Sequence, residues 1–179
     1  WLYPALSGVR HTGFAYVFVS PEPSVLAAYL TADVPPNVEL SQVLVWSFDY
    51  MLGNADRGHY KPSWKAILFY RGIDAGDLDF PRIEERLSVH SVNAETDGLG
   101  RAGYDLRMPI ELARRLVRQS TDEGGFVFDP FAHEGAFLVA ASELGRDAMG
   151  YESDSRRLRK AYERGVTRGD SDEVIGRSL

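Results

Sequence analysis

The chain has 179 residues, of which 44% are hydrophobic and 26% charged, a composition typical of a globular protein with one domain. Its formal net charge of −6 argues against a nucleic-acid binder that is basic over its whole surface, and the lack of cysteine excludes disulfides and thiolate metal sites. No segment approaches the roughly 20 apolar residues of a membrane span, and the first residues lack the pattern of a signal peptide, so we expect a cytoplasmic protein with no membrane partner.

The first part of the sequence predicts strands with one helix among them. Aromatic and β-branched residues predict strands over three ranges: 13–20, 40–48 and 64–71. The third strand is a candidate for antiparallel pairing with the second. Ser24 is a suitable N-cap for a helix, and Pro35 and Pro36 end that segment. Residues 72–103 lack periodicity, and we expect irregular structure there with one short strand at 85–89.

From residue 109 onward, helices and strands alternate. Pro109 suits the first position of an amphipathic helix, and Gly145 suits a helix C-cap. The apolar runs predict a strand at 125–128, a helix from 137, a strand at 148–151 and a final helix that begins at 153–155. Alternation of this kind predicts an α/β fold with a doubly wound, mostly parallel sheet.

The stretch FDPFAHEGAF, residues 128–137, joins a predicted strand to the helix that follows. A strand that ends at Asp129 and turns directly into a helix would expose backbone N–H groups and a carboxylate at the carboxyl edge of the sheet, where open α/β sheets bind ligands. Glu152, at the end of the next predicted strand, is placed to accept hydrogen bonds from both hydroxyls of a ribose. Spacing alone leaves two interpretations open, a nucleoside pocket and an ordinary turn.

Residues 127–165 resemble the cofactor-binding half of amino-group DNA methyltransferases, which methylate adenine N6 or cytosine N4. That family runs from a strand into DPF-x-G-x-G, then through a helix, LGR, a strand ending in G-x-E-x-D, and a helix ending in an E-R pair. The matching residues here are 129–131, Gly135, 144–146, 150–154 and Glu163-Arg164. The upstream strands resemble the family's later strands, in the permuted order in which the catalytic region precedes the cofactor loop.

The resemblance implies a class I, Rossmann-like methyltransferase fold in a single domain over 1–179, with S-adenosylmethionine as cofactor. No metal is expected, because no second ligand is clustered with His133 in the sequence. It implies site-specific methyl transfer to adenine or cytosine in double-stranded DNA, with the target base flipped out of the duplex. An oligomer or a restriction partner is compatible with the family. The implied cofactor-binding residues are Asp129, Phe131, Ala132, His133, Glu134, Gly135 and Glu152.

DNA contacts are expected from two segments, the loop at 49–62 and the irregular segment at 72–103, which lies where the family places target recognition. Solvated loops are the alternative interpretation of both. The polar residues of the first loop are Asn54, Arg57, His59 and Lys61. Five basic residues also crowd the last predicted helix, where a solvated helix face is the simplest interpretation: Arg156, Arg157, Arg159, Lys160 and Arg164.

Several family positions are changed in this sequence. His133 stands where the family has its first loop glycine, and Ala136 stands where it has threonine. Because only glycine adopts positive φ freely, the histidine is expected to require a different backbone angle or to obstruct the cofactor. Met108 stands in place of the lysine that precedes the helix proline.

The family's catalytic tetrapeptide, D/N/S-P-P-Y/F/W, does not occur in the sequence, and no residue receives a catalytic assignment. The stretch 33–37, DVPPN, is interpreted as a helix-terminating loop. In the permuted order the tetrapeptide precedes Gly13, so we expect the domain to be incomplete at its amino end. Two alternatives to an active methyltransferase remain. One is a degenerate, non-catalytic binding module on the same fold, and the other is a dinucleotide-dependent oxidoreductase, which would need G-x-G-x-x-G where this loop has one glycine.

Overall fold

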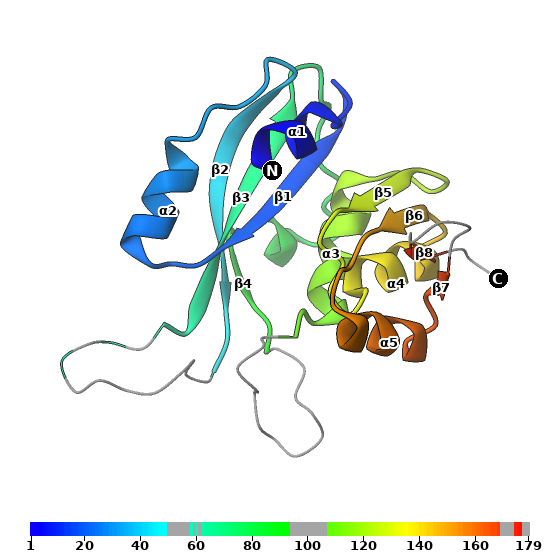
Figure 1. The fold of residues 1–179 in the computed structure, drawn as a ribbon. Coiled ribbons are helices and arrows are strands. Elements are labelled where there is room, and N and C mark those ends of the chain that lie inside the picture. Colours follow the sequence, from blue (N-terminus) through cyan, green and yellow to red (C-terminus); the bar gives the residue numbers. More distant parts are fainter. Residues whose placement is uncertain (50–57, 59, 61, 94–106, 169–173, 177–179) are drawn as a thin grey trace. The chain divides into compact units, whose positions relative to one another are not determined.

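The computed structural model describes residues 1–49, 58, 60, 62–93, 107–168 and 174–176. The chain divides into two compact units, Trp1–Leu106 and Arg107–Leu179, each of which has its own sheet (Figure 1). No helix in the described part of the chain has the length and apolar character that crossing a membrane requires.

The first unit is built on a four-stranded sheet with the order β1-β3-β2-β4. Strand β3 pairs antiparallel with both β1 and β2, and β4 adds parallel to β2. The strands are β1 (Phe14–Val19), β2 (Val38–Ser47), β3 (Trp64–Gly72) and β4 (Val89–Ser91). The helices are α1 (Leu2–Ser7), α2 (Pro23–Leu30) and the 3-10 helix η1 (Ile83–Arg86).

Strand β3 lies at the centre of this unit. Its residues from Ala66 to Tyr70 are fully or almost fully buried, as expected for a strand covered on both faces. One face carries a core cluster that includes Leu6 of α1 and Leu68 of β3, with residues of α2 packed against it. The opposite face carries aromatic side chains, among which Tyr16 stacks on Phe69 with ring centroids 5.1 Å apart.

The stretch 33–37 is a structural loop after α2, as the sequence predicted. The Asn37 side chain donates hydrogen bonds to the carbonyls of Leu6 (3.1 Å) and Val9 (2.7 Å), and so satisfies carbonyls at the end of α1. The backbone carbonyl of Pro35 accepts from Val38 N–H at the start of β2. These contacts give the DVPPN stretch a structural role.

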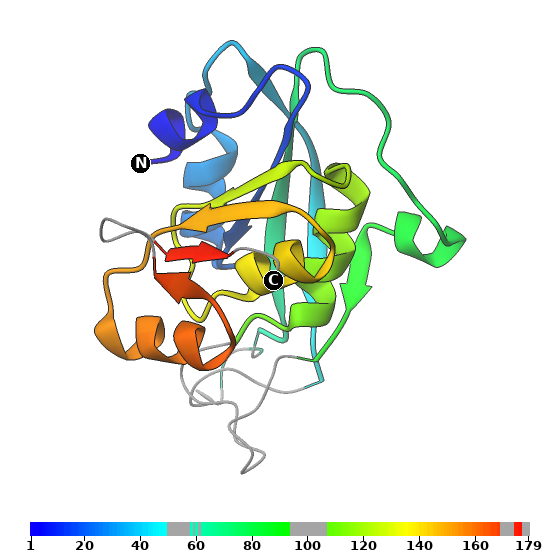
Figure 2. The same ribbon diagram turned by 90° about the vertical axis from the view of Figure 1, so that its right-hand side faces the viewer.

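The second unit contains a four-stranded sheet with the order β5-β6-β8-β7. Its strands are β5 (Phe126–Asp129), β6 (Asp147–Gly150), β7 (Thr167–Arg168) and β8 (Val174–Gly176). Its helices are α3 (Ile110–Ser120), α4 (Ala136–Glu143) and α5 (Ser155–Glu163). Figure 2 shows β5 and β6 side by side, and they pair in parallel with α4 as their connection. Their core is made largely of small residues from α4, β6 and α5, which allows helix and sheet to approach closely.

The arginine of the LGR stretch holds two helix ends together. The guanidinium of Arg146 donates to the carbonyl of Thr121, the C-cap of α3, and to the carbonyl of Leu144, the C-cap of α4. Gly145 has φ of 73°, the left-handed conformation that glycine adopts after a helix. The LGR stretch therefore satisfies carbonyls that two helices would otherwise leave without partners.

Antiparallel pairings outnumber the parallel ones among the described strands, which differs from the mostly parallel sheet expected. Parallel pairing is found for β5 with β6, where the strand-helix-strand pattern predicted it, and for β2 with β4. The other four described pairings are antiparallel: β3 lies between β1 and β2 and runs opposite to both, and β8 lies between β6 and β7 and runs opposite to both.

Other sequence predictions need correction at the level of single elements. The strand expected at 85–89 is wrong: η1 occupies 83–86, and the short strand begins only at Val89. Helix α2 has Glu22 rather than Ser24 as N-cap, because Pro23 with its fixed φ occupies the first turn. Pro109 is the N-cap of α3 and Ile110 the first helical residue. Helix α1 and the strands β7 and β8 had no counterpart in the prediction.

Replacement of Gly150 by alanine should destabilise the second unit. A Cβ at Gly150 would lie 2.8 Å from the Asp129 carbonyl oxygen and 2.9 Å from the Ala132 Cβ, so the backbone of both strand ends would have to move. Overpacking of this kind costs about 1–3 kcal/mol. Urea denaturation of Gly150→Ala should show this loss, whereas Gly76→Ala, where a Cβ meets nothing within 4 Å, should be neutral or slightly stabilising. Equal stability of the two variants would contradict the packing described.

Candidate cofactor site

The parallel pairing of β5 and β6 places two acidic residues at one edge of the sheet. Asp129 ends β5 and is in register with Gly150, which ends β6, and Glu152 follows two residues later. Tyr151 N–H donates to the Asp129 carbonyl at 3.0 Å, which continues the pairing beyond the strand ends. The structure therefore brings Asp129 and Glu152 to the same edge, as the sequence predicted.

The loop after β5 turns tightly and returns to the end of β6. The Asp129 carboxylate accepts from Phe131 N–H at 3.0 Å, and the Ala132 N–H donates to the Tyr151 carbonyl at 2.8 Å. Ala132 is buried against the unit's core. The loop is thus fixed to both strand ends before α4 begins at Ala136.

Two residues of the loop have left-handed backbone conformations. His133 has φ of 49° and is the only non-glycine residue with positive φ among those described, and Gly135 has φ of 76°. A Cβ at Gly135 would lie 2.9 Å from Val166 Cγ2, so a side chain there would be both strained and crowded. The histidine that stands at a family glycine therefore adopts the backbone angle expected of a glycine.

Burial raises the pKa of the Asp129 carboxyl above its ordinary value, and the nearby Glu152 carboxylate raises it further. The Phe131 N–H and the nearby His133 act in the opposite direction and favour the ionised form. A partly buried carboxyl group with a raised pKa marks a candidate functional site, because burying its charge costs free energy.

The Glu152 carboxylate is half-buried and accepts from Asp154 N–H at 2.7 Å, which orients it at the end of β6. Asp154 in turn is the N-cap of α5, where it accepts from Arg156 N–H at 2.8 Å. The Arg156 guanidinium and backbone hydrogen bonds hold the pKa of the Asp154 carboxyl down to about 2. The G-Y-E-S-D stretch therefore forms both the end of a strand and the cap of the next helix.

Aromatic side chains are exposed beside the acidic pair. Phe131 in the loop is 52% exposed, and Phe128 and Tyr151 are in contact edge to face with ring centroids 5.9 Å apart. Exposed aromatic faces next to carboxylates can stack on a flat heteroaromatic ring while the carboxylates accept its hydrogen-bond donors. The edge has the groups that a nucleoside requires.

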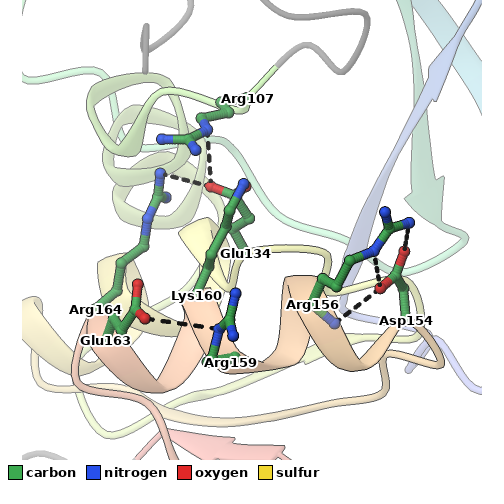
Figure 3. A network of polar contacts seen from close by, with 8 residues as sticks. All are labelled: Arg107, Glu134, Asp154, Arg156, Arg159, Lys160, Glu163 and Arg164. Atoms are coloured by element: carbon green, nitrogen blue, oxygen red, sulfur yellow. Dashed lines mark hydrogen bonds and ion pairs between the residues drawn. The ribbon is translucent and has the colours of Figure 1, made fainter. Parts of the chain in front are cut away.

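The Glu134 side chain is engaged by basic residues of the same unit (Figure 3). Lys160 Nζ lies 2.8 Å from one carboxylate oxygen, and guanidinium nitrogens of Arg164 and Arg107 lie 3.2 and 3.3 Å from the other. The sequence did not reveal this network, although Lys160 and Arg164, four residues apart on one helix, form a pair that can meet a single carboxylate.

Many of the residues that the sequence suggested for DNA contacts lie outside the described part of the chain. Asn54, Arg57, His59 and Lys61, together with residues 94–103, lie outside the described residues, so their expected DNA contacts stay predictions. Within the ranges that the structure describes, no group of three or more histidine and acidic residues is placed to hold a metal ion.

Solved structures with a similar fold include a DNA methyltransferase and a complex with SAM. The complex of M1.HpyAVI with SAM has a TM-score of 0.69 and 20% sequence identity, with 87% of this chain and 76% of that chain covered. The PvuII DNA methyltransferase, which is cytosine-N4-specific, has a TM-score of 0.65 and 14% identity, with 90% and 66% covered. The fold is therefore the mixed α/β class I fold of S-adenosylmethionine-dependent methyltransferases.

The family model N6_N4_Mtase, DNA methylase, matches residues 1–163, so the chain belongs to the N6/N4 DNA methylase family. This assignment confirms the resemblance seen in the sequence and replaces the oxidoreductase alternative. Curated relatives include the type II methyltransferases M.MthZI of Methanothermobacter thermautotrophicus, 44% identical over 46 residues, and M.HindIII of Haemophilus influenzae, 41% identical over 54 residues. These stretches cover 26% and 30% of this chain and 13% and 18% of the relatives' own lengths.

Replacement of Asp129 by asparagine should stabilise the folded chain at neutral pH. The pKa of this carboxyl is higher in the folded state than its ordinary value of 3.8. Ionisation of Asp129 therefore destabilises the folded state progressively as the pH rises from 3.8 through the folded-state pKa. Asparagine keeps the acceptor for Phe131 N–H and has no charge to bury. Denaturant midpoints measured from pH 4 to 8 should be higher for Asp129→Asn than for the wild type at pH 7, and the difference should shrink toward pH 4. The exposed Asp147→Asn variant is the control, and an equal gain there would refute the assignment.

Proposed function

We propose that the protein binds S-adenosylmethionine at the edge formed by the 129–135 loop and Glu152. On this proposal it acts as a site-specific DNA methyltransferase on the exocyclic amino group of adenine (N6) or cytosine (N4). The observation that carries the proposal is the convergence of Asp129, Glu152 and the loop at one sheet edge, in a chain of the N6/N4 DNA methylase family. The solved structure of M1.HpyAVI in complex with SAM supports the choice of cofactor.

The residues at this edge fit such a cofactor. Glu152 would accept hydrogen bonds from the ribose hydroxyls, and the exposed aromatic faces of Phe131 and Tyr151 would lie against the adenine. Asp129, Ala132 and Gly135 would shape the methionine side, where the close approach of the loop backbone leaves no room for larger side chains. When bound, the cofactor supplies an activated methyl group on its sulfonium.

The proposed substrate is double-stranded DNA, with the target base flipped out because an amino group within the duplex is not accessible to a transferred methyl group. With a net charge of −6, the protein would meet the phosphates through a locally basic face. The names of the type II relatives support a role in restriction-modification, and we include a restriction partner or an oligomer, and a cytoplasmic location, in the proposal.

A non-catalytic binding module is the second candidate function. It is favoured by one observation, the histidine at the family's loop glycine. Such a module would keep the fold and a nucleoside or DNA surface without transferring a methyl group.

Replacement of Glu152 by glutamine should weaken S-adenosylmethionine binding by about 10- to 100-fold. This is the change in affinity expected when one charge-assisted hydrogen bond is lost. Glutamine retains an oxygen for Asp154 N–H, so the start of α5 should stay intact. Isothermal titration measures the affinity, and Glu123→Gln, an exposed change before β5 begins, is the matched control. Unchanged affinity in a folded Glu152→Gln variant would remove this residue from the site.

Methyl transfer separates the two candidate functions. Duplex DNA incubated with the protein and cofactor carrying a tritiated methyl group should acquire label, and digestion should identify N6-methyladenine or N4-methylcytosine as the product. A protein that binds the cofactor and DNA but transfers no label at saturation would be the non-catalytic module.

A further inference from the structure

The carboxylate of Glu134 forms ion pairs with three basic residues. Lys160, Arg164 and Arg107 each place a nitrogen within 3.3 Å of it (Figure 3). The arrangement restrains the position of the one carboxylate from several directions at once.

The network is sheltered from solvent. The side chains of Glu134 and Arg164 are only 13% and 16% exposed, so their attraction is screened less than that of a surface pair. A surface pair on the same helix gives the contrast. Arg159 and Glu163 are 74% and 67% exposed, and their charged atoms lie 3.9 Å apart.

The partners of Glu134 come from both sides of the loop in the sequence. Lys160 belongs to α5 and Arg164 is its C-cap, whereas Arg107 precedes α3. The adjacent Gly135 meets α5 as well, since a Cβ there would lie 3.3 Å from the Cβ of Ala161. Gly135 thus lies close to α5, and ion pairs of Glu134, the residue before it, join the loop to the same helix.

The residue before Glu134 is the one that needs an anchor. His133 has φ of 49°, a region in which the Cβ of an L-residue is close to the next carbonyl oxygen, so the conformation persists only where the surroundings hold it. His133 itself is exposed, and its own side chain is not enclosed by the core. The Gly135 N–H donates to the Ala132 carbonyl at 2.7 Å and closes the turn over His133 and Glu134, and the Glu134 carboxylate is the group in this turn that ion pairs join to α5 and to Arg107.

We propose that Glu134 is a positioning residue for the cofactor. Its carboxylate, held by Arg107, Lys160 and Arg164, keeps His133 in the left-handed conformation and thereby holds the loop in the shape that receives S-adenosylmethionine. This inference rests on the proposed function, since it assigns the loop at 129–135 to cofactor binding. The ionic anchor does for this loop what a glycine at position 133 would do by its own conformational freedom.

The test is a double-mutant cycle between positions 133 and 134, with S-adenosylmethionine affinity measured by isothermal titration well below the melting temperature of each variant. Glu134→Gln should bind the cofactor about tenfold more weakly than the wild type. In the His133→Gly background the same change should cost less than about twofold, because glycine adopts positive φ without restraint. Glu163→Gln, which removes an ion pair from α5 without contact to the loop, should leave the affinity unchanged.

Hydrogen exchange provides a readout that needs no cofactor. Backbone amides of 131–135 should exchange faster in Glu134→Gln than in the wild type, whereas that of Leu144, which donates to the Ala140 carbonyl at the far end of α4, should keep its rate. A general loss of stability would accelerate both regions together, and that result would overturn the positioning role.

The outcomes separate this inference from the function on which it rests. Equal losses of affinity from Glu134→Gln in the wild-type and His133→Gly backgrounds would overturn the positioning role and leave the cofactor site standing, as would full affinity in Glu134→Gln. A folded wild-type protein that does not bind S-adenosylmethionine would overturn the proposed function itself.

Discussion

The close approach of the ends of β5 and β6 is the constraint on which the rest of the second unit depends. Two backbone hydrogen bonds, from Tyr151 N–H to Asp129 and from Ala132 N–H to Tyr151, continue the strand pairing into the loop. They require a residue without a side chain at Gly150, where a Cβ would collide with the Asp129 carbonyl. Because the strand ends lie this close, the carboxylates of Asp129 and Glu152 and the backbone of the loop reach the same edge of the sheet. Helices α4 and α5 begin a few residues after these strand ends. The proposed nucleoside site therefore depends primarily on backbone geometry.

The loop shows how a residue other than glycine can occupy a left-handed conformation. His133 adopts a glycine-like angle, and the ion pairs of Glu134 lie one residue away. Restraint by ion pairs differs physically from restraint by glycine, since it is screened by salt and depends on side chains 26 and 30 residues further along the chain. A glycine and an ion-pair restraint can both support a left-handed backbone, but only the ion-pair restraint weakens as the salt concentration rises.

Much of the second unit could be predicted from the sequence because its signals are local. Strand, loop and helix follow one another within a few residues, and Asp129 and Glu152 each end an apolar run. The Glu134 network could not be predicted, since it joins three separate segments. In the sequence alone, each of its charged residues resembles an ordinary surface residue. In the first unit, η1 was missed because Glu85 is buried and its N–H closes a turn on Arg82, a tertiary outcome that propensity does not encode. Helix α1 is too short for periodicity to reveal.

The position of β3 between β1 and β2 has a consequence for the synthesis of the chain. Residues 20–63 separate β1 from the only strand with which it pairs among those described, so β1 leaves the ribosome well before its partner exists. At about 5–20 residues per second, the aromatic segment FAYVFV spends several seconds as an unpaired strand with high β propensity and no charge. During this interval, helices α1 and α2, which are translated before β3, can shield the apolar side chains of β1 but cannot satisfy its backbone hydrogen-bonding groups.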